Sequence, residues 1–95
     1  MAKIWLLIHE SCRDGEVSTD IIPCKTEEVA KRELHTKAID IVALAYNIDT
    51  EDIEKEFYHD KDYIMEREGD KYFYVTCRHE NTYDSLNVKC KKVIE

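Results

Sequence analysis

The segment from Lys3 to Cys12 reads KIWLLIHESC. Apolar side chains occupy both alternating sets of its positions, with Ile4, Leu6 and Ile8 on one side and Trp5 and Leu7 on the other. This pattern is typical of an interior strand, because both faces of such a strand meet other side chains. The segment therefore predicts a strand inside a sheet.

A β-hairpin is predicted around this strand. Asp14-Gly15 supplies the positive φ angles that a two-residue turn needs. Residues 16–22 are rich in β-branched side chains, and Pro23 ends this second strand because proline cannot donate to a strand ladder.

A long helix is predicted from Thr26 to about Tyr46. Thr26 is a suitable N-cap, and Glu27 and Glu28 lie in the first turn, where the helix dipole favours negative charge. An apolar stripe with helical spacing is expected to face the sheet: Ala30, Leu34, Ala38, Ile41 and Ala45.

The same helix carries a second stripe, formed by His35, Ile39, Val42 and Tyr46. One interpretation is that a short second helix, predicted from Glu51 to about Tyr58, covers this stripe within the chain. The alternative is that the stripe forms the seam of a homodimer. The chain is therefore expected to be either a monomer or a homodimer.

The rest of the chain predicts three strands, at residues 63–68, 71–78 and 86–94. Alternation in the last strand directs four side chains to the core: Leu86, Val88, Cys90 and Ile94. The predicted order is ββααβββ. Together these elements predict an α+β fold in one domain over residues 1–95, with a mostly antiparallel sheet of about five strands and with one long and one short helix on one face.

Composition narrows the class of protein further. The chain has 95 residues, of which 43% are hydrophobic and 37% charged, as suits one globular domain. The apolar run from Ile4 to Ile8 is too short for a signal peptide or a membrane span, so a cytoplasmic protein without membrane contact is expected. In that compartment the four cysteines are expected to be thiols.

Several enzyme classes lack their signatures in this sequence. Its two glycines, Gly15 and Gly69, fit neither a P-loop nor a dinucleotide-binding fingerprint. The sequence has no G-x-S-x-G nucleophile elbow and no Cys-x-x-Cys pair. We therefore expect no cofactor, and the sequence favours a non-enzymatic protein.

A metal site is an alternative suggested by residue type. His9, Cys12, Cys77 and His79 would offer zinc two nitrogens and two sulfurs if their strands were neighbours. The corresponding function is a small ligand- or metal-binding domain, or an enzyme, with a site around His9, Cys77 and His79. The simpler interpretation is that these residues are core thiols and peripheral histidines.

Direct binding of nucleic acid is not expected. The formal net charge of −7 opposes contact with phosphate backbones. One segment resembles an aromatic platform for unpaired bases, namely Tyr72, Phe73 and Tyr74. Few basic residues lie near it in the sequence.

The charge is unevenly distributed along the chain. Residues 49–70 contain ten acids and three bases, a net charge of −7, whereas the other residues carry eleven of each sign. The predicted binding surface consists of Glu51, Asp52, Glu54, Glu56, Asp60, Asp62 and Glu66. We expect it to attract a basic protein surface, and the alternative is a solvated face that only keeps the protein soluble.

Overall fold

A computed structural model describes residues 2–93 of the chain. Within this range the elements are β1 (Ala2–Arg13), β2 (Glu16–Cys24), α1 (Glu27–Asp40), η1 (Ile41–Ala45), η2 (Thr50–Glu54), β3 (Phe57–His59), β4 (Tyr63–Glu68), β5 (Tyr72–Cys77) and β6 (Tyr83–Val93). The predicted α+β class is confirmed, although six strands replace the expected five.

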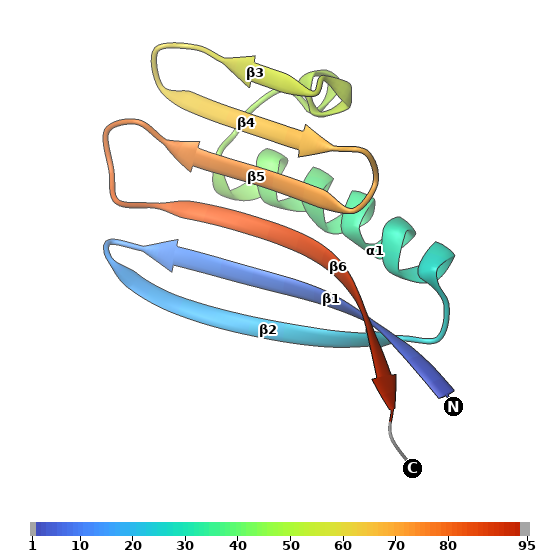
Figure 1. Ribbon diagram of the computed structural model, residues 1–95. Helices are drawn as coiled ribbons and strands as arrows, with labels where there is room; N and C mark the ends of the chain where they lie inside the picture. The colour runs from blue at the N-terminus through green and yellow to red at the C-terminus, as the bar shows by residue number, and fades with distance from the viewer. Residues whose placement is uncertain (1, 94–95) are drawn as a thin grey trace.

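The six strands of the described chain form one antiparallel sheet in the order β2-β1-β6-β5-β4-β3. β6 lies inside the sheet, where it pairs with β1 on one side and with β5 on the other. The last strand therefore joins the N-terminal hairpin to the β3-β4-β5 meander (Figure 1). β2 and β3 are the two edges, at opposite ends of the sheet.

The predicted hairpin is present, and its turn has the expected geometry. Asp14 and Gly15 have φ angles of 52° and 87°, in the left-handed region that a tight two-residue turn requires. The Gly15 N–H also donates to the Asn81 carbonyl oxygen at 3.2 Å, which ties the hairpin to the loop before β6.

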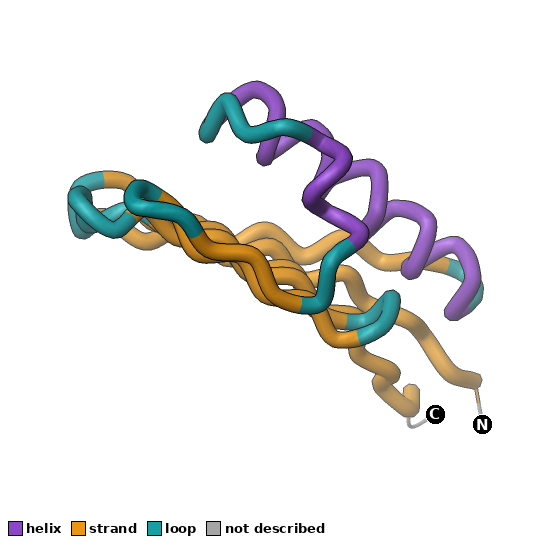
Figure 2. The backbone as a smooth tube through the Cα atoms, turned by 90° about the horizontal axis from the view of Figure 1, so that it is seen from above, coloured by secondary structure: helices purple, strands orange, loops and turns teal. Residues whose placement is uncertain are grey.

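The helical segments cover one face of the sheet (Figure 2). α1 begins at the predicted cap, where Thr26 Oγ1 accepts a hydrogen bond from the Val29 N–H at 3.1 Å. Small and branched residues of α1 pack on the sheet, and the buried core combines them with residues from three strands: Ala30, Leu34 and Ala38 with Leu7, Phe73, Val75 and Leu86.

The predicted helical stripe holds as far as Ile41, which is partly buried against the core. α1 continues into η1, a turn of π-helix, which holds more residues per turn than an α-helix. Positions four apart therefore stay aligned, and Val42 and Tyr46 continue the buried row. Ala45, which the prediction placed inward, is exposed for this reason.

The second predicted helix is wrong in type and extent. The chain forms a short 3₁₀ segment, η2, and then extends as β3. Phe57 and Tyr58 lie in this strand, where pairing with β4 satisfies backbone groups of the edge. The predicted order ββααβββ is corrected accordingly, because a single α-helix precedes four strands.

The last strand begins at Tyr83, three residues before the predicted start at Leu86. These residues pair with both β1 and β5. Because side chains alternate along a strand, Asp84 faces the same side as Leu86 and Val88. All three are buried.

The four cysteines are free thiols within strands. Cys12 and Cys24 are buried, and Cys77 is half-buried. Cys90 is exposed and not in the core as predicted; at this position β6 pairs with β1 alone, because its pairing with β5 ends at Asn87. Ile94, also predicted to face the core, lies outside the described residues.

Candidate functional site

Residues 49–70, which we call the acidic edge, lie at one end of the sheet. They comprise η2, β3, β4 and the connections between them, and β3 is the edge strand at that end (Figure 1). All seven carboxylates predicted from the sequence as a binding surface belong to this edge: Glu51, Asp52, Glu54, Glu56, Asp60, Asp62 and Glu66.

Some carboxylates of the acidic edge contact the chain's own basic groups. Lys55 Nζ lies 2.7 Å from Asp52, and Arg67 Nη1 lies 3.1 Å from Glu54. Asp62 lies 3.4 Å from His79 Nε2, a contact that becomes an ion pair when the histidine is protonated. Pairs of this kind at the surface add little stability, but they offset part of the local charge.

Asp60 has a structural role in the turn between β3 and β4. Its carboxylate accepts hydrogen bonds from the N–H groups of Asp62 and Tyr63, at 2.7 and 2.8 Å, and from the Tyr58 hydroxyl at 2.8 Å. The bond from the Asp62 backbone is the main cause that lowers the pKa of Asp60. Asp60 is therefore less available to a partner than its position in the sequence suggests.

Four glutamates of the acidic edge are in a different situation. They are exposed, and their carboxylates make no ion pair or hydrogen bond with other residues of the described chain: Glu51, Glu56, Glu66 and Glu68. Three of them are among the predicted site residues, and Glu68 is an addition. These carboxylates supply four of the seven negative charges by which acids exceed bases in the acidic edge.

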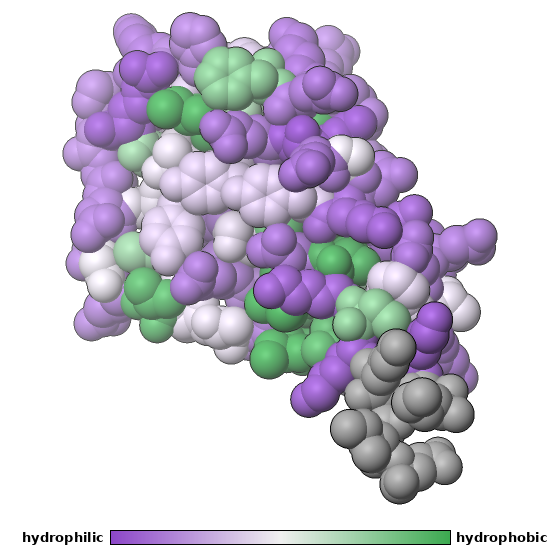
Figure 3. All heavy atoms as spheres, viewed as in Figure 1, coloured by the Kyte–Doolittle hydropathy of each residue, from purple (hydrophilic) through white to green (hydrophobic). Residues whose placement is uncertain are grey.

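The sheet face opposite the helices, which we call the open face, has no helix of the described chain over it (Figure 2). Strand pairing gathers half-buried apolar and aromatic side chains there: Ile4, Leu6, Ile8, Ile64, Tyr72, Tyr74 and Tyr83. The rings of Tyr74 and Tyr83 lie 6.0 Å apart. Figure 3 views this face, with pale aromatic rings near its middle and green hydrophobic groups among purple hydrophilic ones.

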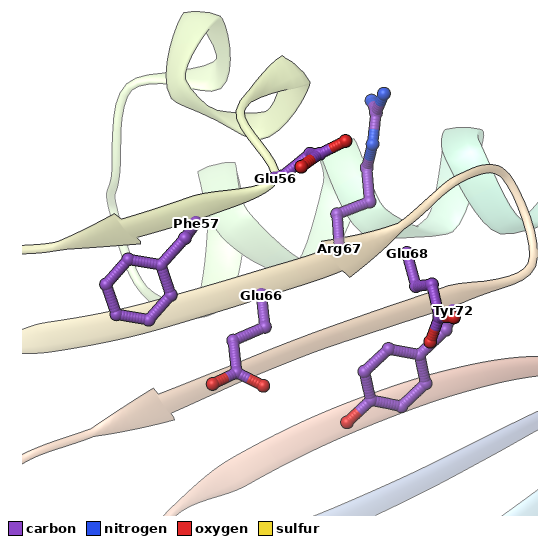
Figure 4. A pocket seen from close by; sticks show the side chains of 6 residues that line it. All are labelled: Glu56, Phe57, Glu66, Arg67, Glu68 and Tyr72. Carbon is purple, nitrogen blue, oxygen red and sulfur yellow. The ribbon is translucent and has the colours of Figure 1, made fainter.

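A groove of about 350 Å³, the edge groove, lies where the open face meets the acidic edge. It is lined by Glu56, Phe57, Glu66, Arg67, Glu68 and Tyr72. In Figure 4 the rings of Phe57 and Tyr72 lie on either side of the Glu66 carboxylate, and Glu68 lies beside Tyr72. The side chains of Glu56 and Arg67 extend away from the two rings.

Burial and the carboxylates of the edge groove both raise the pKa of its tyrosine, Tyr72. Burial is the largest cause that raises the pKa of Tyr72, and the charge of Glu66 raises it further. Glu68, which is the strand partner of Tyr72 in β4, acts in the same direction. The groove is therefore a place of negative potential between two aromatic rings.

A buried polar cluster, the Asp84 network, lies under the C-terminal end of the helical layer. Asp84 is 0% exposed. Its Oδ1 accepts from His9 Nε2 at 2.7 Å, and its Oδ2 accepts from the Tyr46 hydroxyl and from Arg13 Nη1, both at 2.8 Å. The Arg13 guanidinium also lies 5.8 Å from the centre of the Tyr46 ring.

These bonds keep Asp84 ionised. Burial opposes the charge, but the hydrogen bond from His9, followed by those from Arg13 and Tyr46, holds the pKa of Asp84 below its ordinary value. Burial and the bond to Asp84 raise the pKa of Tyr46. With both oxygens occupied and no exposed surface, this carboxylate joins β1, β6 and the helical layer and is not accessible to a reactant.

Asp84 and Arg13 are not among the residues that the sequence patterns predict as a site. A signal was present, since alternation counted back from Leu86 predicts an inward position for Asp84. The predicted start of the last strand excluded that residue. An inward carboxylate between apolar positions requires partners, and the sequence does not say which basic residues reach it.

The residues of the predicted metal site do not come together. β6 lies between β1, which carries His9 and Cys12, and β5, which ends at Cys77. His9 is bonded to Asp84, and His79 Nε2 lies 2.9 Å from the Lys61 carbonyl oxygen. Among the described residues, no three histidine, cysteine or acidic side chains are placed to hold a metal ion.

The predicted dimer seam of His35, Ile39, Val42 and Tyr46 is not a continuous exposed stripe. Val42 and Tyr46 belong to the core, at 0% and 4% exposure, and Ile39 packs against it. His35 is exposed and lies 3.6 Å from Glu54. Two of the four residues are thus buried within the chain, and the oligomeric state stays a prediction.

Comparison of the chain with protein-family models, with curated proteins and with solved structures found no match. The function is therefore inferred from the geometry and charge of the chain itself. In the part of the chain that the structure describes, none of the helices has the length and apolar content needed to span a membrane.

Proposed function

We propose that the protein is a small non-enzymatic interaction protein that binds a basic protein surface through its acidic edge. The observation that carries this proposal is the location of the charge. Residues 49–70 account for the whole formal charge of −7, and they lie together at one end of the sheet. A local field of this kind attracts a basic surface, accelerates encounter and weakens as salt is added.

The neighbouring open face supports the proposal. Protein interfaces combine an apolar, aromatic centre with a polar rim. Tyr72 and Tyr74 lie on β5 beside β4, whose Glu66 and Glu68 point to the same face. A partner with basic residues around an apolar patch would match both parts of this surface.

The test neutralises the four unpaired glutamates together. The edge variant is Glu51→Gln, Glu56→Gln, Glu66→Gln and Glu68→Gln. Its matched control neutralises four exposed acids outside the edge, as Glu16→Gln, Asp20→Asn, Asp40→Asn and Glu80→Gln. Both variants change the net charge from −7 to −3, so they differ only in where the charge is lost.

Each protein is immobilised at low salt and exposed to lysate of the source cell, and bound proteins are quantified by mass spectrometry. We expect the wild type and the control variant to retain the same basic proteins, and the edge variant to lose them by about tenfold, or ~1.4 kcal/mol of binding free energy. Equal retention by all three proteins, or equal loss by both variants, would contradict the proposal. Circular dichroism establishes that both variants are folded.

A further inference from the structure

We propose that the edge groove receives an arginine side chain of the basic partner. This inference rests on the proposed function and specifies the chemistry of its central contact. The groove joins two aromatic rings and two unpaired carboxylates at the boundary between the acidic edge and the open face.

The rings provide the walls. Phe57 is 54% exposed although it is apolar, and Tyr72 is half-buried on the neighbouring side of the groove. A guanidinium group is planar and weakly hydrated, so it stacks on aromatic faces and gains from the negative potential above them. Stacking on an arginine would remove the Phe57 ring from water.

The carboxylates provide the complementary charge. Glu66 is the strand partner of Phe57, and Glu68 is the strand partner of Tyr72, so each carboxylate is directly opposite one ring. The two glutamates are two residues apart on β4, which places their backbones about 6.8 Å apart on the same face. A carboxylate beside a ring can accept two parallel N–H bonds from a guanidinium while the ring stacks on it.

The size and surroundings of the groove favour a side chain over a larger ligand. Its volume of about 350 Å³ is at the small end of the ~300–1,000 Å³ usual for ligand sites. The chain's own Arg67 does not fill it, since Arg67 Nη1 is directed to Glu54 at 3.1 Å and to the Ile53 carbonyl oxygen at 3.5 Å. Among the described residues, no basic side chain therefore pairs with Glu66 or Glu68, and the groove can accept a cation from another molecule.

The experiment uses N-acetyl-arginine amide as the probe and follows the backbone amide signals of the whole chain by NMR. N-acetyl-citrulline amide is the matched control, because it keeps the shape of arginine without the charge. We expect arginine to shift the signals of Phe57, Glu66, Glu68 and Tyr72, and citrulline to bind at least about tenfold more weakly, a difference of ~1.4 kcal/mol.

Two double variants of equal charge compare the two groove carboxylates with two exposed acids outside the groove. Glu66→Gln with Glu68→Gln is expected to weaken arginine binding about tenfold, whereas Glu16→Gln with Glu80→Gln should weaken it less than about twofold. Phe57→Ala is expected to weaken it about fivefold, because the stacking wall is lost. Amide spectra of the free variants show that each one keeps the fold.

Three results would overturn the inference: no binding of arginine, equal binding of citrulline, or equal loss in the two double variants. Each of them leaves the proposed function intact if the four-site edge variant still loses its basic partners. Conversely, if that variant keeps its partners while arginine binds in the groove, the proposed function is wrong and only arginine binding by the groove is supported.

Discussion

Asp84 and Glu66 are carboxylates of the same sheet, but they lie in opposite environments. Asp84 is on an inner strand beneath the helical layer, 0% exposed, with His9, Arg13 and Tyr46 bonded to it. Glu66 is on the open face of β4, exposed, and no ion pair or hydrogen bond engages its carboxylate among the described residues. The charge of Asp84 therefore holds the fold together, whereas the charge of Glu66 is available to another molecule.

The two carboxylates differ in their access to water. Removing a partner from a buried carboxylate lowers the free energy of unfolding by several kcal/mol, because water cannot replace the lost hydrogen bond. Exposed carboxylates are hydrated and screened, so their mutual repulsion is small and falls with salt. The Asp84 network should therefore dominate stability, and the acidic edge should dominate binding.

The largest effect is expected from Asp84→Asn. The amide keeps the shape of the side chain but leaves Arg13 and His9 without a buried anion, so we expect the free energy of unfolding to fall by about 3 kcal/mol. Urea unfolding followed by circular dichroism measures this. The matched control is Asp20→Asn, an exposed position opposite His9 on β2, where we expect less than about 0.5 kcal/mol.

Asp84 also predicts a dependence on pH. Its folded pKa is lowered, so its stabilising contribution is complete above the unfolded value of about 3.9 and is lost as the pH falls through the folded pKa. The gap in stability between wild type and Asp84→Asn should therefore narrow below about pH 4. A gap that stays constant down to about pH 2 would show that ionised Asp84 does not stabilise the fold.

An intermediate effect is expected from Tyr46→Phe. The change removes one hydroxyl donor from the buried carboxylate and leaves the ring in the core, so a loss of about 1.5 kcal/mol in unfolding free energy is expected. Tyr58→Phe is the control, because its hydroxyl bonds Asp60 at the surface. Equal losses in the two variants would contradict the assignment of the Tyr46 bond to the stabilising network.

The smallest effect on stability is expected at the acidic edge. Neutralising Glu51, Glu56, Glu66 and Glu68 relieves repulsion, so we expect a gain of about 0.5 kcal/mol at low salt. The gain should vanish near 1 M salt, where the Debye length is about 3 Å. Thermal unfolding at both salt concentrations tests this, and a loss of more than about 1 kcal/mol would place these glutamates among the residues that hold the fold.

Much of the fold could be predicted from local patterns. Alternation identified the first strand, Asp14-Gly15 identified the hairpin turn, and Thr26 identified the start of the helix. The errors fall where local preference is weak. Phe57 and Tyr58 were expected in the second helix, and pairing with β4 makes them part of β3 at the sheet edge.

The candidate site could be predicted only in part. The concentration of acids in residues 49–70 is visible in the sequence, but the sequence does not show which of them form hydrogen bonds or ion pairs within the chain. Asp60 is held by the N–H groups of its own turn, and Glu54 of η2 by Arg67 of β4. Glu68 emerges as unpaired only because strand pairing places it on the open face opposite Tyr72.

The sequence by itself determined the α+β class, the hairpin, the helix and the segment that carries the net charge, because each depends on neighbours within a few residues. Only the tertiary structure decided that β6 would lie between β1 and β5, that Asp84 would meet Arg13 and His9, and that Phe57 and Tyr72 would flank Glu66. These contacts join residues far apart in the chain, and their partners are chosen by strand order and register. Local composition does not specify either of them.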